Sequence, residues 1–152
     1  MKPKTSRWLD TALRAQQART LDHHYRVHET EATHRQAQQL ESAAVQDLHA
    51  LALSWRQGRD AAQLSHGLDG LYQRFHAHLY VEAAVATQAL ASHQLALDEA
   101  LLHLRQSYAL QQGLDRTIQR REQRSAKDVL AKERSSATET WMLAQAGKKG
   151  SE

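Results

Sequence analysis

The feature that most constrains this chain is the near absence of helix breakers over two long segments. Between Pro3 and Gly58 there are 54 consecutive residues with neither Pro nor Gly, and from Leu71 to Ala146 the only breaker is Gly113. Because Pro and Gly are the residues that cost an α-helix most, both segments are compatible with unbroken helices. The remaining internal glycines fall between residues 58 and 70. The sequence therefore predicts two long helices joined by one short connection.

The composition favours helix and excludes a sheet protein. Ala, Leu, Gln, Arg, Glu, Lys and Met supply 94 of the 152 residues, whereas the chain has one Ile, five Val and one Phe. The seven common types favour helices, and strands need the β-branched and aromatic residues that are scarce here. Much of the 41% apolar content is Ala. Such a chain suits the thin apolar stripe of a coiled coil better than a broad core, so the predicted fold class is all-α.

The short connection favours a chain that folds back on itself. We predict one antiparallel coiled-coil hairpin spanning residues 1–152. A parallel pairing of two extended chains is the competing geometry. The predicted parts of the hairpin are a first arm over residues 5–57, a tip over 58–70, a second arm over 71–144 and a frayed tail over 145–152.

An apolar stripe repeats along the first arm. Its thirteen steps cover 47 residues, a mean spacing of about 3.6, which places its members on one face of a straight helix. In the second arm the spacing of Leu97, Leu101, Leu104 and Tyr108 is typical of a coiled-coil seam. We expect both faces to meet in the hairpin. The stripe of the first arm consists of Trp8, Ala12, Ala15, Ala18, Leu21, Tyr25, His28, Ala32, Gln36, Leu40, Ala44, Leu48, Leu51 and Trp55.

The residues that carry chemistry in enzymes do not form a recognisable constellation here. The chain has no Cys, which excludes disulfides, thiolate nucleophiles and Cys-based zinc sites. It also has no Gly-rich phosphate loop, and two packed helices offer no enclosed pocket, so we expect neither an enzyme nor a cofactor. Glu31 and His34 have the Glu-x-x-His spacing of di-iron bundles, but the second arm does not repeat it. We therefore predict no metal site.

The longest segment without Asp, Glu, Lys or Arg is Ala83–Leu97, with 15 residues. A bilayer crossing needs about 20 apolar residues, so we predict no membrane span. The lack of Cys is also typical of a cytoplasmic protein.

Positive charge concentrates toward both ends of the chain. Residues 1–57 carry 8 basic and 6 acidic side chains, residues 58–110 carry 3 and 5, and residues 111–152 carry 9 and 6. In a hairpin with joined ends these charges would form one positive pole. This positive pole has three possible interpretations: a solvated helical face, a docking surface for an acidic protein, or a nucleic-acid site. For nucleic acid the basic excess is small, so we predict no nucleic-acid partner. The densest run comprises Arg116, Arg120, Arg121, Arg124 and Lys127.

Four large side chains cluster just after the tip, namely Tyr72, Phe75, Leu79 and Tyr80. One interpretation is that they pack against each other and the first arm at the tip. The other is that they form an exposed hydrophobic patch for a partner.

Two segments carry a resemblance to a known family. The sequence LYQRF at Leu71–Phe75 is followed by Leu79, and the charged run Arg120–Arg134 is followed by Trp141. Together with the long Gly-poor arms, they make residues 40–145 resemble the small stalk proteins of type III secretion, the FliJ family of flagella and its YscO and HrpO relatives in injectisomes. The resemblance implies a cytoplasmic antiparallel coiled coil, peripheral to the secretion apparatus, whose joined ends enter the pore of the hexameric export ATPase.

The resemblance also implies partners and sites. The implied partners are the export ATPase, the cytosolic domain of the export gate and, in some members, export chaperones. Phe75 and Leu79 match the spacing of the residues that contact the gate, and Tyr72 lies beside them. The positive pole is where the pore contact would fall, and by position its candidates are Arg7, Arg14, Arg121 and Arg124. The alternative function is a self-associating coiled-coil scaffold, or a chaperone-like adaptor without an ATPase partner.

Overall fold

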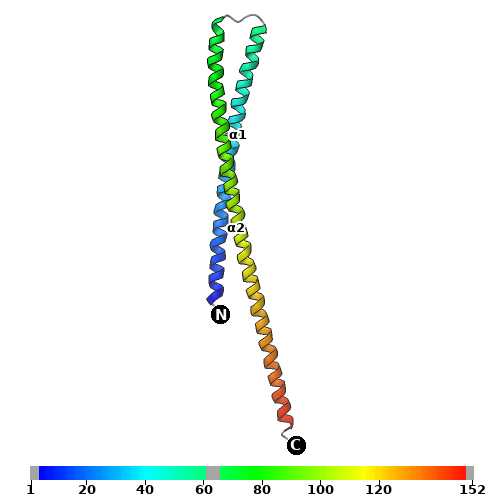
Figure 1. Cartoon of the computed structure of the whole chain (residues 1–152). Coiled ribbons are helices and arrows are strands. Elements are labelled where there is room, and N and C mark those ends of the chain that lie inside the picture. Colours follow the sequence, from blue (N-terminus) through cyan, green and yellow to red (C-terminus); the bar gives the residue numbers. More distant parts are fainter. Residues whose placement is uncertain (1–3, 61–65, 150–152) are drawn as a thin grey trace. The chain divides into compact units, whose positions relative to one another are not determined.

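The computed structural model describes residues 4–60 and 66–149, and the side chains of residues 7–60 and 68–145. Helix α1 spans Lys4–Asp60 with 57 residues, and helix α2 spans His66–Lys149 with 84 residues. The two helices pack as an antiparallel hairpin, which confirms the predicted all-α fold class (Figure 1). Both ends of the predicted tip, residues 58–60 and 66–70, are helical, and its middle, residues 61–65, lies outside the described residues.

The hairpin comprises two compact units. One consists of residues 19–107, and the other of the described parts of residues 1–18 and 108–152. In the first unit, three contacts between α1 and α2 fix the register of the helices. In each contact the two residue numbers add up to 126 or 127, so the register does not slip along the unit. These contacts are the hydroxyl pair Thr20–Ser107 at 2.8 Å, the stacked rings of His23 and His103 at 5.9 Å, and those of Trp55 and Tyr72 at 4.2 Å.

The contact between the helices is a coiled-coil seam. Buried and half-buried side chains recur at alternating steps of four and three on each helix, the heptad spacing that supercoiled helices share. On α1 the seam comprises Leu9, Leu13, Gln16, Thr20, His23, Val27, Thr30, His34, Ala37, Glu41, Ala44, Leu48, Leu51 and Trp55. On α2 it comprises Tyr72, His76, Leu79, Ala83, Ala86, Leu90, His93, Leu97, Ala100, Leu104, Ser107, Gln111, Leu114 and Ile118.

The apolar stripe predicted for the first arm is wrong over most of its length. Its last four members, Ala44 to Trp55, lie in the seam, but Trp8, Leu21, Tyr25 and Leu40 are 68%, 56%, 67% and 61% exposed. A stripe with a period of 3.6 rotates away from a seam with a period of 3.5 by about 20° per heptad. Over the five heptads before Ala44 this rotation removes the stripe from the interface.

Polar residues occupy many of the seam positions that the predicted stripe passed over. Gln16, Thr20 and Ser107 are only 7%, 5% and 4% exposed, while no large side chain among the described residues is fully buried. The hydroxyls of Thr20 and Ser107 satisfy each other at 2.8 Å, which removes most of the cost of burying them. Polar seam residues specify the register of a coiled coil at a cost in stability. This seam is therefore thin and polar.

Helix α2 continues past the beginning of α1. It has 84 residues against 57 in α1, a difference of 27. In the second unit the seam ends at Leu9 and Ile118, whose numbers keep the same sum, so α1 begins level with about residue 123 of α2. Every side chain from 119 to 145 is exposed, and Figure 1 shows α2 running on past the N-terminal end of α1. We call residues 123–149 the α2 extension, a helical segment about 40 Å long.

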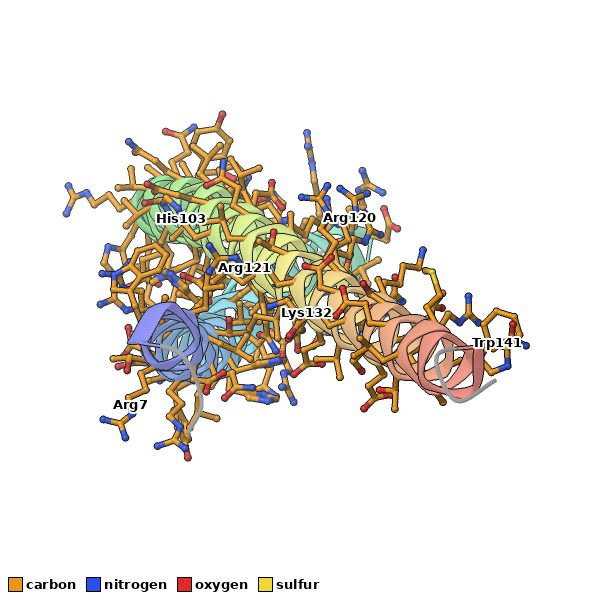
Figure 2. The ribbon with its side chains drawn as sticks, turned by 90° about the horizontal axis from the view of Figure 1, so that it is seen from below. Arg7, His103, Arg120, Arg121, Lys132 and Trp141 are labelled. Atoms are coloured by element: carbon orange, nitrogen blue, oxygen red, sulfur yellow. The ribbon has the colours of Figure 1, made fainter. Side chains whose placement is uncertain are left out.

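The extension overturns the expectation that the two ends of the chain lie side by side. Trp8 lies level with residue 119, so Trp141 is about 33 Å farther along α2 at 1.5 Å per residue. In Figure 2 Trp141 projects from the far end of α2. The positive pole predicted for joined ends is therefore wrong: the basic residues of the second arm continue along α2 beyond those of α1.

Candidate partner-binding surfaces

The structure separates the three residues predicted to bind the export gate. Tyr72 is half-buried and stacks on Trp55, with ring centroids 4.2 Å apart and ring planes 15° apart. Leu79 is half-buried in the seam. Phe75 is 55% exposed. Tyr72 and Leu79 thus pack within the hairpin, and of the three only Phe75 is exposed for a partner.

Two leucines that the sequence reasoning missed accompany Phe75. Leu68 and Leu71 are 39% and 59% exposed, and the steps of three and four from Leu68 to Phe75 place all three side chains on one face of α2. We call Leu68, Leu71 and Phe75 the tip patch. The exposed Tyr80, at 61%, lies five residues after Phe75 and hence on another face. In the sequence, the spacing of three and four residues between Leu68, Leu71 and Phe75 could have indicated the tip patch. The clustering of aromatic residues did not indicate it.

The four arginines predicted to bind the ATPase pore are all exposed but do not form one cluster. Arg7 and Arg121 lie at almost the same level of the second unit, and Figure 2 shows Arg7 projecting from the side of α1 away from α2. Arg14 lies two helical turns from Arg7, about 10 Å along α1. Arg124 stands at the base of the α2 extension.

The strongest concentration of charge lies where α2 passes the beginning of α1 and continues alone. Between Arg116 and Arg134 there are seven basic and three acidic side chains, and all ten are exposed. Arg120 and Lys132 belong to this run and leave the helix in different directions in Figure 2. The basic run therefore presents charge around most of a single helix.

A groove lies between α1 and α2 in the first unit. Its volume is about 580 Å³, and its floor is mostly aliphatic. Leu40, Val81 and Val85 on its walls are 61%, 58% and 61% exposed. The sequence reasoning missed this groove because Leu40 was assigned to the seam and the two valines lie off the leucine repeat of α2. Its lining includes Leu40, His78, Val81, Glu82, Val85 and His93.

Over residues 4–60 and 66–149, neither helix contains an apolar segment long enough to cross a bilayer. Within the same described ranges, no three His, Asp or Glu side chains are placed to share a metal ion. Comparisons with protein families, characterised proteins and solved structures gave no match to this chain. The surfaces described above are therefore interpreted from their own geometry and charge.

Proposed function

We propose that this chain is a central stalk or adaptor of a bacterial type III secretion export apparatus, flagellar or injectisome. Its proposed partners are the hexameric export ATPase and the cytosolic domain of the export gate. The resemblance of the LYQRF segment and the charged run supports this proposal, as does the antiparallel hairpin of two long helices. The single observation that carries it is the α2 extension, which is a basic helix exposed on all described sides.

The dimensions of a helix explain why the extension suits a pore. One α-helix with its side chains is about 10–12 Å wide, and two packed helices are roughly twice as wide. A single helix thus enters a narrower channel than the joined ends of a hairpin would need. Arg121 and Arg124 lie at the base of the extension, where such a channel would meet the rest of the hairpin. Their positive charge suits an acidic pore lining.

The mechanism follows from symmetry. A stiff rod without six-fold symmetry cannot contact six ring subunits equally. It binds some subunit conformations more tightly than others, and a ligand shifts a conformational equilibrium by that difference in affinity. The chain would then promote assembly and turnover of the ATPase ring without catalysing any step itself.

Charge reversal at the four arginines tests the ATPase contact. Replacing Arg7, Arg14, Arg121 and Arg124 by Glu is expected to lower the stimulation of ATP hydrolysis by at least about tenfold, because charges that pair across an interface become repulsive. The measurement is the ATPase rate of the purified hexamer with and without the chain, together with co-purification of the two proteins.

A matched control changes the charge equally at a distance from this site. Arg56, Arg59, Arg74 and Arg105 are also exposed, and replacing these four by Glu is expected to leave the stimulation within about twofold. Undiminished stimulation by the first variant contradicts the proposed contact. If the unmodified chain neither stimulates nor co-purifies with the ATPase, the scaffold or chaperone-like adaptor is the better reading.

The tip patch is the proposed contact for the export gate. Phe75→Ala with Leu71→Ala is expected to weaken binding to the cytosolic domain of the gate at least about tenfold, because both exposed side chains would be buried in the complex. Isothermal titration calorimetry measures the affinity, and circular dichroism should show unchanged helicity. Tyr80→Ala, on another face, is the control. Equal weakening by the two variants would argue against the tip patch.

A further inference from the structure

The groove of the first unit is apolar and long enough for a helix. The residues of α2 that line it run from His78 to His93, a span of 15 residues or about 22 Å. Leu40, Val81 and Val85 stand exposed on its walls. Grooves of this kind bind the apolar face of an amphipathic helix. A helix of about four turns would cover the exposed side chains.

The surroundings of the groove are acidic. Residues 36–55 and 75–104 contain no Lys or Arg at all. At the edge of the groove, Glu82 lies 3.2 Å from His78, with 54% of its side chain exposed. The nearest arginine in sequence, Arg35, is 3.6 Å from Glu31. The groove therefore favours a basic occupant. The carboxylates in the two segments are Glu41, Asp47, Glu82, Asp98 and Glu99.

The α2 extension has the length, apolar stripe and charge that this groove requires. Its steps of four, seven and four place Ala126, Leu130, Ala137 and Trp141 on one face, over the same span of 15 residues as the groove. Leu130 and Trp141 are 54% and 62% exposed. One edge of this stripe carries three basic side chains spaced by seven, which therefore lie in a row. They are Lys127 and Arg134 in the extension and Arg120 just before it.

We propose that a second copy of this chain fills the groove. The α2 extension of one molecule lies as a third helix against the first unit of the other, with Leu130 and Trp141 along the aliphatic part of the groove. The basic row faces the acidic edge. Each molecule offers one extension and one groove, so the contacts are satisfied either by a reciprocal two-fold pair or, repeated head to tail, by a longer chain of molecules. It requires no ATPase and does not rest on the proposed function.

Charge reversal along the basic row tests the contact. The full chain is expected to pass from monomer to larger species between about 1 µM and about 1 mM, the range of moderate affinities. Analytical ultracentrifugation measures this change. Replacing Arg120, Lys127 and Arg134 by Glu is expected to weaken association at least about tenfold.

The control alters two basic residues on the opposite side of the same helix, Arg121 and Lys132. Replacing them by Glu should change association less than about twofold, because their side chains face solvent in the complex. Arg121 is also one of the arginines proposed to contact the ATPase. If the control variant loses ATPase stimulation but keeps self-association, the two proposed contacts are separate. They are also separate if the variant of the basic row loses self-association but keeps ATPase stimulation.

A mixing experiment tests that the extension meets the groove. Leu130→Glu with Trp141→Ala removes the stripe, and Val81→Asp with Val85→Asp fills the groove with charge. All four side chains are more than half exposed, so both variants should keep their helicity by circular dichroism. Each variant alone is expected to be monomeric, and an equimolar mixture should form a one-to-one pair. A wild-type chain that stays monomeric up to about 1 mM overturns the proposal. Equal effects of the basic row and its control, or a mixture that stays monomeric, also overturn it.

Discussion

Val27→Asp is expected to unfold the hairpin of the first unit. Val27 is 6% exposed in the seam, level with Ala100 of α2. The substitution removes a buried aliphatic side chain and places a carboxylate where it has no basic partner in register. The combined loss is about 3 kcal/mol or more, which is large for so thin a seam. Far-UV circular dichroism during urea denaturation measures the free energy of unfolding.

The control for this substitution is Leu21→Asp. Leu21 belongs to the stripe predicted from the sequence, but it is 56% exposed in the structure. Its replacement is expected to change the free energy of unfolding by no more than about 0.5 kcal/mol. A loss at Leu21 as large as the loss at Val27 would mean that the stripe with a period of 3.6, and not the heptad seam, faces α2.

Replacing His23 and His103 by Leu is expected to stabilise the same unit by about 1 kcal/mol. The two rings stack between the helices at 5.9 Å, and His103 Nε2 lies 3.7 Å from Glu99 Oε1 in an exposed pair. His23 is half-buried in the seam, whereas the side chain of His103 is 51% exposed beside it, so most of the apolar surface gained would be at position 23. The exposed pair that is lost contributes little. Urea denaturation of both single variants and the double variant gives the coupling between the positions.

His28 and His78 provide a matched control. Each lies near a glutamate on its own helix, as His103 does, but their side chains are 74% and 67% exposed. Replacing both by Leu is expected to leave the free energy of unfolding within about 0.5 kcal/mol, because little surface becomes buried. If replacing His23 and His103 gives no more stability than this control, these two histidines do not limit the stability of the hairpin.

The sequence supported some parts of the fold better than others. In α2, Leu97 and Leu104 lie in the seam as predicted, because leucines at heptad spacing mark a seam directly. The other two predicted positions are wrong: the seam passes through Ala100 and Ser107, Leu101 is half-buried beside it, and Tyr108 is 41% exposed. In α1 the seam runs through Gln16, Thr20 and His23, which hydrophobic periodicity alone passes over. These residues are tolerated in the seam because groups on α2, such as the hydroxyl of Ser107, face them.

The candidate surfaces, like the seam, were predicted only in part from the sequence. Phe75 was predicted and is exposed, but Leu68 and Leu71 beside it and the groove at Val81 and Val85 were missed. An exposed aliphatic residue cannot be told from a seam residue until the partner helix is placed. The α2 extension could have been predicted from the sequence, because the predicted second arm was already longer than the first. The expectation of joined ends overlooked that difference.

By itself the sequence determined that this protein forms two long helices and roughly where they begin and end. Helix formation depends on local backbone preferences, and the positions of Pro and Gly record them directly. Only the tertiary structure decided which face of each helix is covered, and that the last 27 residues of α2 have no partner helix among the described residues. A seam belongs to both helices at once: its register is set by pairs such as Thr20–Ser107, and neither helix alone contains that information.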